Sequence, residues 1–206
     1  HYLIEKDIVD IYDPKAREVF FAGMMKASSE NIYSFSYGTV QGEYYGARRN
    51  PDNEIEIMRS DGATGGKSTY YSLMPDLTSG KITERLGKFD PRTRDWYKIA
   101  QEQGKPIFSP IYEHFAMNDL AVSASYPVYN QDGILKGVLG THFTLSKVNR
   151  FLEESLRDIE AFAYIIERDT GFLVANSLGL PNFVAQNDTA IKRITIDEID
   201  DEHIKT

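Results

Sequence analysis

The sequence predicts an α+β fold in which a helical N-terminal segment precedes a β-rich, antiparallel part of the chain. Tyrosine and phenylalanine are abundant, with 13 Tyr and 11 Phe beside a single Trp, and such rings favour half-buried strands and pocket walls. Segments of alternating polarity are separated by short turn sequences, which is typical of hairpins. Apolar residues at helical spacing occur near the N-terminus and directly after the predicted hairpins.

Composition and charge exclude several function classes. The 206 residues carry a formal net charge of −8, and Lys and Arg form no continuous stripe, so a phosphate backbone would repel the chain on average. Nucleic acid is therefore not an expected partner. The absence of cysteine removes disulfides, thiolate metal sites and cysteine nucleophiles, and the four histidines lie far apart in the sequence, so we expect neither a metal nor a cofactor.

No window reaches the roughly 18 consecutive apolar residues that would span a bilayer, and the first residue is His1 rather than Met. We therefore expect an excised fragment. In the full-length protein we expect an apolar segment of about 20 residues shortly before His1 and another after Thr206.

Helical spacing and a capping signal predict two N-terminal helices. Apolar residues recur at helix-like intervals in residues 2–12, and Asp13-Pro14 then supplies an N-cap followed by proline at the first helical position. We expect a helix, a break, and a second helix that ends near Ser28. Aromatic-rich runs on either side of Gln41-Gly42 predict two strands, and residues 54–59 alternate as a third.

The segment 61–67 shows a partial likeness to a phosphate-binding loop, because it leads into Gly66-Lys67-Ser68. Asp61 replaces the first glycine of that motif. The residues that follow, Thr69-Tyr70-Tyr71-Ser72, predict a strand where the motif requires a helix N-terminus. We therefore interpret the segment as a hairpin loop.

Residues 89–104 predict a short amphipathic helix. Asp90 caps it, Pro91 takes the first helical position, Trp96 and Tyr97 lie on its apolar face, and Gly104 ends it.

The remainder predicts a long hairpin followed by a second, smaller unit. Residues 120–128 alternate up to a turn at 130–133, and 134–145 returns as the partner strand. Ser146 can cap a helix after it, and the turn Asp169-Thr170-Gly171 separates two further strands. Residues 177–206 are polar and acidic and predict no particular element.

Three segments carry a pattern in a definite order and spacing. They read Phe89-Asp90-Pro91-Arg92-Thr93-Arg94-Asp95-Trp96-Tyr97, Tyr126-Pro127-Val128-Tyr129, and Asp132-Gly133-Ile134-Leu135-Lys136-Gly137-Val138-Leu139-Gly140. The pattern continues into Phe143-Thr144-Leu145, Ile165-Ile166-Glu167-Arg168-Asp169-Thr170-Gly171 and Ala175-Asn176. Together these segments resemble the double Cache family of extracytoplasmic sensor domains of bacterial and archaeal receptors, across residues 89–176.

The resemblance implies a long N-terminal helix and PAS-like antiparallel-sheet Cache modules. Residues 1–30 would form the helical segment, 31–150 a membrane-distal module that binds the ligand, and 151–206 a linker helix and a smaller or partial membrane-proximal module. The chain would then be a sensor domain and not an enzyme, outside the cytoplasm of a membrane-anchored receptor that forms a homodimer through the N-terminal helix. The output across the membrane would be a histidine kinase, a chemotaxis transducer or a cyclic-nucleotide enzyme.

The resemblance also implies ligand-binding residues. In members that bind amino acids, an Arg-x-Trp-Tyr segment and a later Tyr surround the ligand, and Arg94, Trp96, Tyr97 and Tyr112 match them. His142 stands where these members carry an Asp that accepts the amino group, and Phe89 stands where they often carry Tyr. Tyr126 is a further candidate. A guanidinium pairs with a carboxylate through two parallel donors, so we expect a small carboxylate-containing ligand such as a hydroxy acid or a dicarboxylate.

Other interpretations remain open. Arg94 could form a surface ion pair with Asp90 or Asp95, Trp96 could be plain core, and His142 could be a satisfied buried histidine. An amino-acid or amine sensor of the same fold is one alternative function, and a ligand-free adhesion or scaffold domain is another. A hydrolase is a third, although no recognisable catalytic spacing occurs.

Overall fold

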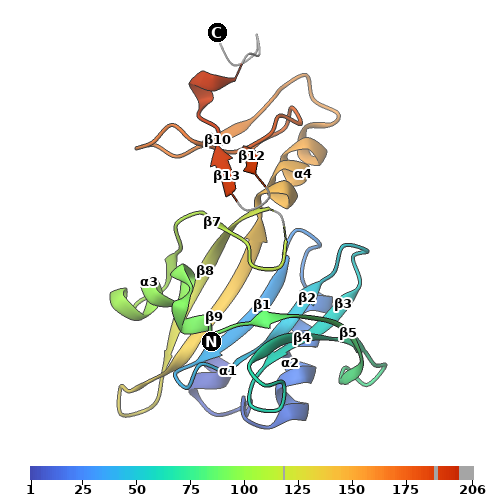
Figure 1. The fold of residues 1–206 in the computed structure, drawn as a ribbon, viewed down its shortest axis with the longest axis vertical. Helices are drawn as coiled ribbons and strands as arrows, with labels where there is room; N and C mark the ends of the chain where they lie inside the picture. The colour runs from blue at the N-terminus through green and yellow to red at the C-terminus, as the bar shows by residue number, and fades with distance from the viewer. Residues whose placement is uncertain (118, 188–189, 200–206) are drawn as a thin grey trace. The chain divides into compact units, whose positions relative to one another are not determined.

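The computed structural model describes residues 1–117, 119–187 and 190–199 (Figure 1). Its α-helices are α1 (Tyr2–Glu5), α2 (Pro14–Ala27), α3 (Asp95–Gln103) and α4 (Leu145–Leu156), and its 3₁₀ helices are η1 (Pro91–Thr93) and η2 (Ile196–Glu198). Its strands are β1 (Ser34–Thr39), β2 (Tyr44–Arg49), β3 (Ile55–Ser60), β4 (Lys67–Leu73), β5 (Ser79–Lys88), β6 (Ile107–Phe108), β7 (Tyr112–Glu113), β8 (Leu120–Tyr129), β9 (Leu135–Thr144), β10 (Tyr164–Ile166), β11 (Leu173–Asn176), β12 (Phe183–Asn187) and β13 (Ala190–Arg193). The α+β class is confirmed.

Within the described residues, nine strands form one sheet in the order β5-β4-β3-β2-β1-β9-β8-β6, with β7 paired to β8 outside this path. Strand β1 brings together two strands that lie far apart in the sequence, because it pairs with β2 on one side and with β9 on the other. The predicted hairpins around Gln41-Gly42 and around residues 130–133 are confirmed. Residues 61–66 connect β3 to β4, as expected of a hairpin loop.

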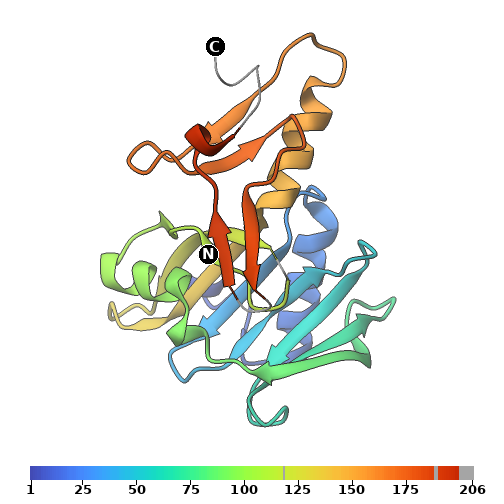
Figure 2. The same cartoon turned by 45° about the horizontal axis from the view of Figure 1, so that its top comes forward.

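The chain divides into two compact units. Unit 1 comprises residues 1–112 and 122–143, and unit 2 comprises residues 113–121 and 144–206, of which the last seven lie outside the described residues. Figure 2 shows the strands of unit 1 from a second direction. The division into segments 1–30, 31–150 and 151–206 stays a prediction.

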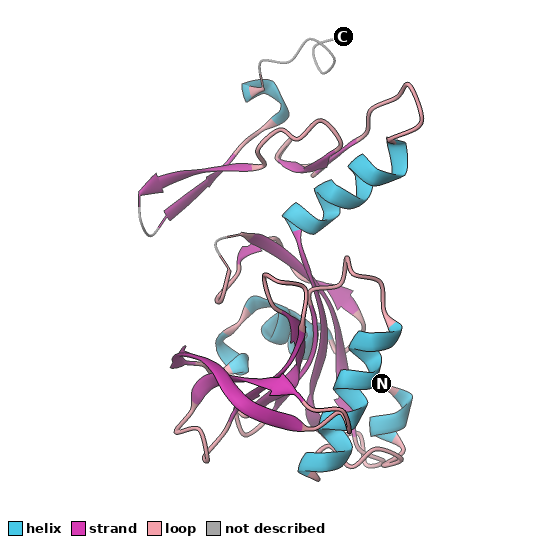
Figure 3. Ribbon diagram, turned by 90° about the vertical axis from the view of Figure 1, so that its right-hand side faces the viewer, coloured by secondary structure: helices cyan, strands magenta, loops and turns pink. Residues whose placement is uncertain are grey.

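In unit 1, α2 packs on one face of the sheet, against β1, β2 and β3 (Figure 3). The helix begins as expected, because Asp13 accepts a hydrogen bond from Ala16 N at 2.6 Å and Pro14 follows it. Its buried side chains Phe21, Ala22 and Met25 join one hydrophobic core with Tyr37, Tyr45, Ala47, Ile57 and Tyr71 of the sheet.

Two helix predictions need correction. The long N-terminal helix that the resemblance implies is interrupted, because α1 ends at Glu5 and Asp7 adopts φ 52°, which turns the chain before α2. Residues 89–104 form two helices, since Arg94 has extended backbone angles between η1 and α3. The predicted ends hold, because Asp90 caps η1 and Gly104 closes α3 in the left-handed conformation that glycine adopts without strain.

In unit 2, α4 packs against β11. The buried Asn176 links these elements, because its backbone N donates to Asn149 Oδ1 at 3.0 Å. The predicted N-cap of α4 is wrong: Thr144 occupies the cap position, and Ser146 instead donates a short hydrogen bond to the buried carboxylate of Asp119. The strands predicted around the turn at 169–171 are confirmed as β10 and β11.

Candidate functional site

One face of the unit 1 sheet carries mostly polar and aromatic side chains, and we call it the polar face. The register places Ser34 beside Arg48 on one side and beside His142 on the other. Because paired residues point to the same side of a sheet and successive residues alternate, the register identifies the members of this face. They include Ser34, Ser36, Tyr44, Arg48, Glu56, Ser60, Tyr70 and His142. Helix α2 packs on the opposite face, and the members of the polar face named here are buried.

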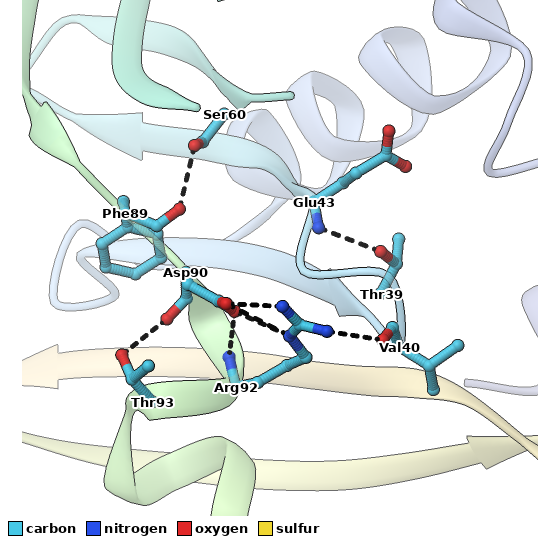
Figure 4. Close-up of polar contacts among 8 residues, drawn as sticks. All are labelled: Thr39, Val40, Glu43, Ser60, Phe89, Asp90, Arg92 and Thr93. Atoms are coloured by element: carbon cyan, nitrogen blue, oxygen red, sulfur yellow. Dashed lines mark hydrogen bonds and ion pairs between the residues drawn. The ribbon is translucent and has the colours of Figure 1, made fainter. Parts of the chain in front are cut away.

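The segment 89–93 is fastened over the polar face by a network of hydrogen bonds (Figure 4). The carboxylate of Asp90 accepts hydrogen bonds from the backbone and guanidinium of Arg92, whose Nη1 donates to Val40 O at 3.2 Å in the β1–β2 turn. The Arg92 hydrogen bonds also lower the pKa of Asp90. At the other end, Ser60 Oγ donates to Phe89 O at 3.0 Å.

Two glycines make this approach possible. A Cβ at Gly42, which has φ +91°, would lie 2.7 Å from the guanidinium of Arg92. A Cβ at Gly38 would lie 2.7 Å from Pro91 and 3.0 Å from the ring of Tyr97. The β1–β2 hairpin therefore supplies the flat surface against which η1 and α3 rest.

His142 is the centre of a buried hydrogen-bond network that joins β1, β7, β8 and β9. Its Nε2 lies 2.6 Å from Ser36 Oγ, and its Nδ1 lies 2.7 Å from Ser123 Oγ and 3.3 Å from Tyr112 Oη. Tyr112 and Ser123 are themselves hydrogen-bonded at 2.7 Å. The ring can reach Ser36 because Gly140 lies beneath it, where a Cβ would stand 2.6 Å from Nε2.

Aromatic rings and one cation surround this network. The rings of Trp96 and His142 meet edge to face at 5.2 Å, and Tyr44 lies 4.7 Å from Phe89. The guanidinium carbon of Arg94 lies 5.7 Å from the centre of the Phe89 ring, within cation–π range. Burial raises the pKa of Tyr112 to about 12, although the Ser123 hydrogen bond and the charge of Arg94 act to lower it.

A second charged group lies further along the polar face. Arg48 is buried, with its Nε 2.9 Å from Glu56 Oε2 and its Nη2 2.5 Å from Glu84 Oε2. Its guanidinium carbon lies 3.3 Å from the centre of the Tyr70 ring. Two carboxylates pair with this one cation, so the charge of Arg48 is compensated and the three groups together remain negative.

The structure brings five of the seven predicted residues together: Phe89, Arg94, Trp96, Tyr112 and His142. Tyr97 is adjacent but fully buried, with its ring against Gly38 and 5.8 Å from Trp96. Tyr126 is the exception. It stacks on His1 at 3.9 Å and packs against the core on the α2 side, because it stands at the wrong parity of β8 to share a face with Ser123.

Sequence reasoning missed Tyr44, Ser36, Ser123 and Arg48. Tyr44 is buried on the polar face, and burial raises its pKa while a hydrogen bond from Ser36 acts to lower it. The alternation of β1 and β2 was the available signal, since it places small polar residues on one face. Only the pairing of β1 with β9 shows that this face contacts His142.

The pairing of serine with histidine invites comparison with a hydrolase. Ser36 and Ser123 both have no exposed surface. A nucleophilic hydroxyl has to reach a substrate, and these two face the imidazole from inside the sheet. The arrangement fits a preorganised binding wall better than a nucleophile.

Across the described residues, no group of three or more His, Asp and Glu side chains is placed to hold a metal ion. Of the helices in that same part of the chain, none is both long and apolar enough to cross a bilayer.

Comparison with known proteins shows a similarity to sensor domains. Residues 50–150, slightly less than half of the chain, match the family model described as methyl-accepting chemotaxis protein-like, first PDC sensor domain. This segment is similar to a chemoreceptor sensor domain. All seven predicted site residues fall within the matched range.

Individual related proteins share less than 30% sequence identity with this chain. The methyl-accepting chemotaxis protein PscA of Pseudomonas syringae is 29% identical over 90 residues, which are 44% of this chain and 14% of that protein. The extracellular domain of mmHK1S-Z3, assigned as a histidine kinase, superposes with a TM-score of 0.54 at 12% identity, covering 99% of this chain and 68% of that one. The ligand-binding domain of the Campylobacter jejuni chemoreceptor Tlp3 with L-valine gives a TM-score of 0.49 at 15% identity, over 86% of this chain and 60% of that domain. The chain thus spans only part of the length of these proteins, and its fold is similar to that of the mmHK1S-Z3 domain.

Proposed function

We propose that this chain is the small-molecule-sensing part of a membrane-anchored signalling receptor, with unit 1 as the ligand-binding module. The observation that carries the proposal is the convergence of Arg94, Tyr112 and His142 on the polar face, inside the segment that matches a sensor domain. In this proposal the domain lies outside the cytoplasm, pairs with a second copy through its N-terminal segment, and contains no catalytic centre of its own.

The proposed ligand carries a carboxylate that Arg94 binds. A guanidinium offers paired donors in a plane, which suits a carboxylate better than a point charge would. Trp96, Phe89 and Tyr44 would provide apolar contact, and Tyr112 would offer its hydroxyl. A ligand changes the state of a receptor only by binding one conformation more tightly than another, so this site has to differ between the two signalling states.

The acceptor for a ligand ammonium group distinguishes the two ligand classes. His142 stands on the polar face with hydroxyl partners at both ring nitrogens, and an imidazole is a poorer partner for an ammonium group than a carboxylate is. A hydroxy acid or dicarboxylate is therefore favoured over a free amino acid. An amino-acid or amine sensor is the alternative within the same fold.

The test is calorimetric titration of the purified chain after a thermal-shift screen of organic acids and amino acids. Arg94→Ala should weaken binding of the identified acid by roughly tenfold or more, since a charge-assisted hydrogen bond contributes about 1.5–3 kcal/mol. Lys98→Ala is the matched control, because it removes an exposed cation from the first turn of α3, close to Arg94 in the sequence. Unchanged affinity in Arg94→Ala would reject the site.

A second variant tests the ligand class. His142→Asp should gain affinity for amino acids and lose affinity for organic acids, because it adds an anion to the polar face. Strong stabilisation of the native chain by ordinary amino acids would instead support the alternative.

A further inference from the structure

Unit 1 contains a separate cavity at the C-terminal end of α2. It has a volume of about 390 Å³ and lies beside the ends of β2, β3 and β4. Its lining residues are Lys26, Arg49, Asn53, Glu54, Ile55, Glu56, Ser72, Leu73 and Thr83. None of the seven predicted ligand-binding residues is among them.

Arg49 is the unusual member of this lining. Only 8% of its surface is exposed, and its Nη2 donates to Met25 O at 2.9 Å and to Ser28 O at 3.4 Å. Its Nε is buried and has no hydrogen-bond partner within the described part of the chain. Among the described residues, no carboxylate forms an ion pair with Arg49.

A buried guanidinium without a counter-charge is costly. The carbonyl groups at the end of α2 carry partial negative charge and compensate part of this cost. They are neutral groups, however, so the guanidinium keeps its positive charge beside the cavity. The cavity next to Arg49 therefore offers a position where an anion would complete the charge balance.

The cavity lining also contains one further cation and two carboxylates. Lys26 is exposed at the rim and adds a second positive charge. Glu56 pairs with Arg48, at 2.8 Å from its Nη2, and Arg48 also pairs with Glu84. Glu54 is exposed and accepts a hydrogen bond from Asn50 at 3.2 Å, so it can turn toward solvent. Ser72, Thr83 and Asn53 add neutral donors.

We propose that this cavity binds a small oxyanion, either an inorganic ion or the carboxylate or phosphate group of a small molecule, through Arg49 and Lys26. This site is independent of the ligand proposed for Arg94. Because Arg49 also ties the end of α2 to β2, an occupied site would hold this junction more firmly than an empty one.

The test uses the whole chain, with inorganic phosphate, sulfate and acetate titrated at constant ionic strength against chloride. Saturable binding of at least one oxyanion is expected. Arg49→Gln should abolish it, but this change also removes hydrogen bonds to α2 and can unfold the chain. Thr83→Glu avoids that problem, because it places a carboxylate in the cavity and leaves the bonds of Arg49 intact.

Thr83→Glu should weaken oxyanion binding by about tenfold or more, whereas Thr83→Gln, its uncharged match, should bind as the native chain does. The difference between Thr83→Glu and Thr83→Gln should persist when Arg94→Ala is added to both, which separates this site from the proposed ligand site. Equal affinity in Thr83→Glu and Thr83→Gln would overturn the proposal. So would stabilisation that follows ionic strength alone, or no saturable binding of any of the three anions.

Discussion

Ser123 and Ser125 offer a matched test of the buried network around His142. Both lie on β8, and both are almost fully buried, with 0% and 3% of their surface exposed. Ser123 Oγ is hydrogen-bonded to His142 Nδ1 and to Tyr112 Oη, each at 2.7 Å. Ser125 Oγ is buried without a hydrogen-bond partner in the part of the chain that the structure describes. The same substitution should therefore have opposite consequences at the two positions.

The expected magnitudes follow from these contacts. Each hydrogen bond of Ser123 contributes about 0.5–1.5 kcal/mol net, so Ser123→Ala should lower the free energy of unfolding by about 1–3 kcal/mol. Tyr112 Oη already lies 3.3 Å from His142 Nδ1 and can recover part of this loss. Ser125→Ala removes an unsatisfied hydroxyl, so the change should range from zero to a gain of about 1 kcal/mol.

Urea unfolding of the native chain and the two variants measures both changes in one assay. The midpoints should separate while the dependence on urea concentration stays the same, because neither change alters the surface exposed on unfolding. Equal losses in the two variants, or a larger loss in Ser125→Ala, would refute the assignment of the network as a stabilising element.

Two further predictions concern glycines and alkaline pH. Gly23→Ala lies within α2, where nothing is within 4 Å of the new Cβ, and it should raise the free energy of unfolding by about 0.5–1 kcal/mol. Gly38→Ala should lower it by about 1–3 kcal/mol, because the new Cβ would displace Pro91 and Tyr97. Thermal unfolding measures both changes, and a more stable Gly38→Ala than Gly23→Ala would contradict the contacts described at Gly38. The pKa of Tyr112 is raised from 10.0 to about 12, so the unfolded state loses this proton first as the pH rises. The contribution of neutral Tyr112 to the free energy of unfolding is therefore complete below about pH 10. Between about pH 10 and 12 it falls by about 1.4 kcal/mol per pH unit. Tyr112→Phe should reduce that slope in an alkaline unfolding series, and an identical slope would contradict the burial of this phenol.

The fold was readable from the sequence wherever a local signal decides local structure. The Asp13-Pro14 cap, the turn at Gln41-Gly42 and the glycine after α3 each depend on a few neighbouring residues. Their chemistry is the same in any context, so they predicted the right boundaries. Local signals failed at two positions. Arg94 adopts an extended conformation that interrupts the predicted helix, and Ser146 binds the carboxylate of Asp119 instead of capping α4.

The candidate site was readable only in part. The resemblance singled out Arg94, Trp96 and Tyr112 because they belong to a recurring segment pattern. The sequence by itself could not tell that Tyr126 points to the other side of the sheet, because the face of a strand residue depends on parity relative to its neighbours and a shift of one residue reverses it.

Tertiary structure alone decided the partners of His142. Ser36 lies 106 positions away in the sequence, and it meets the imidazole only because β1 pairs with β9. The same pairing places Ser34 between His142 and Arg48, so the polar face becomes one continuous surface. Long-range pairing of this kind depends on the free energy of the whole sheet, which no single segment carries. Residue types and turn chemistry determined the elements of this protein, and the register of its sheet decided which of their side chains meet.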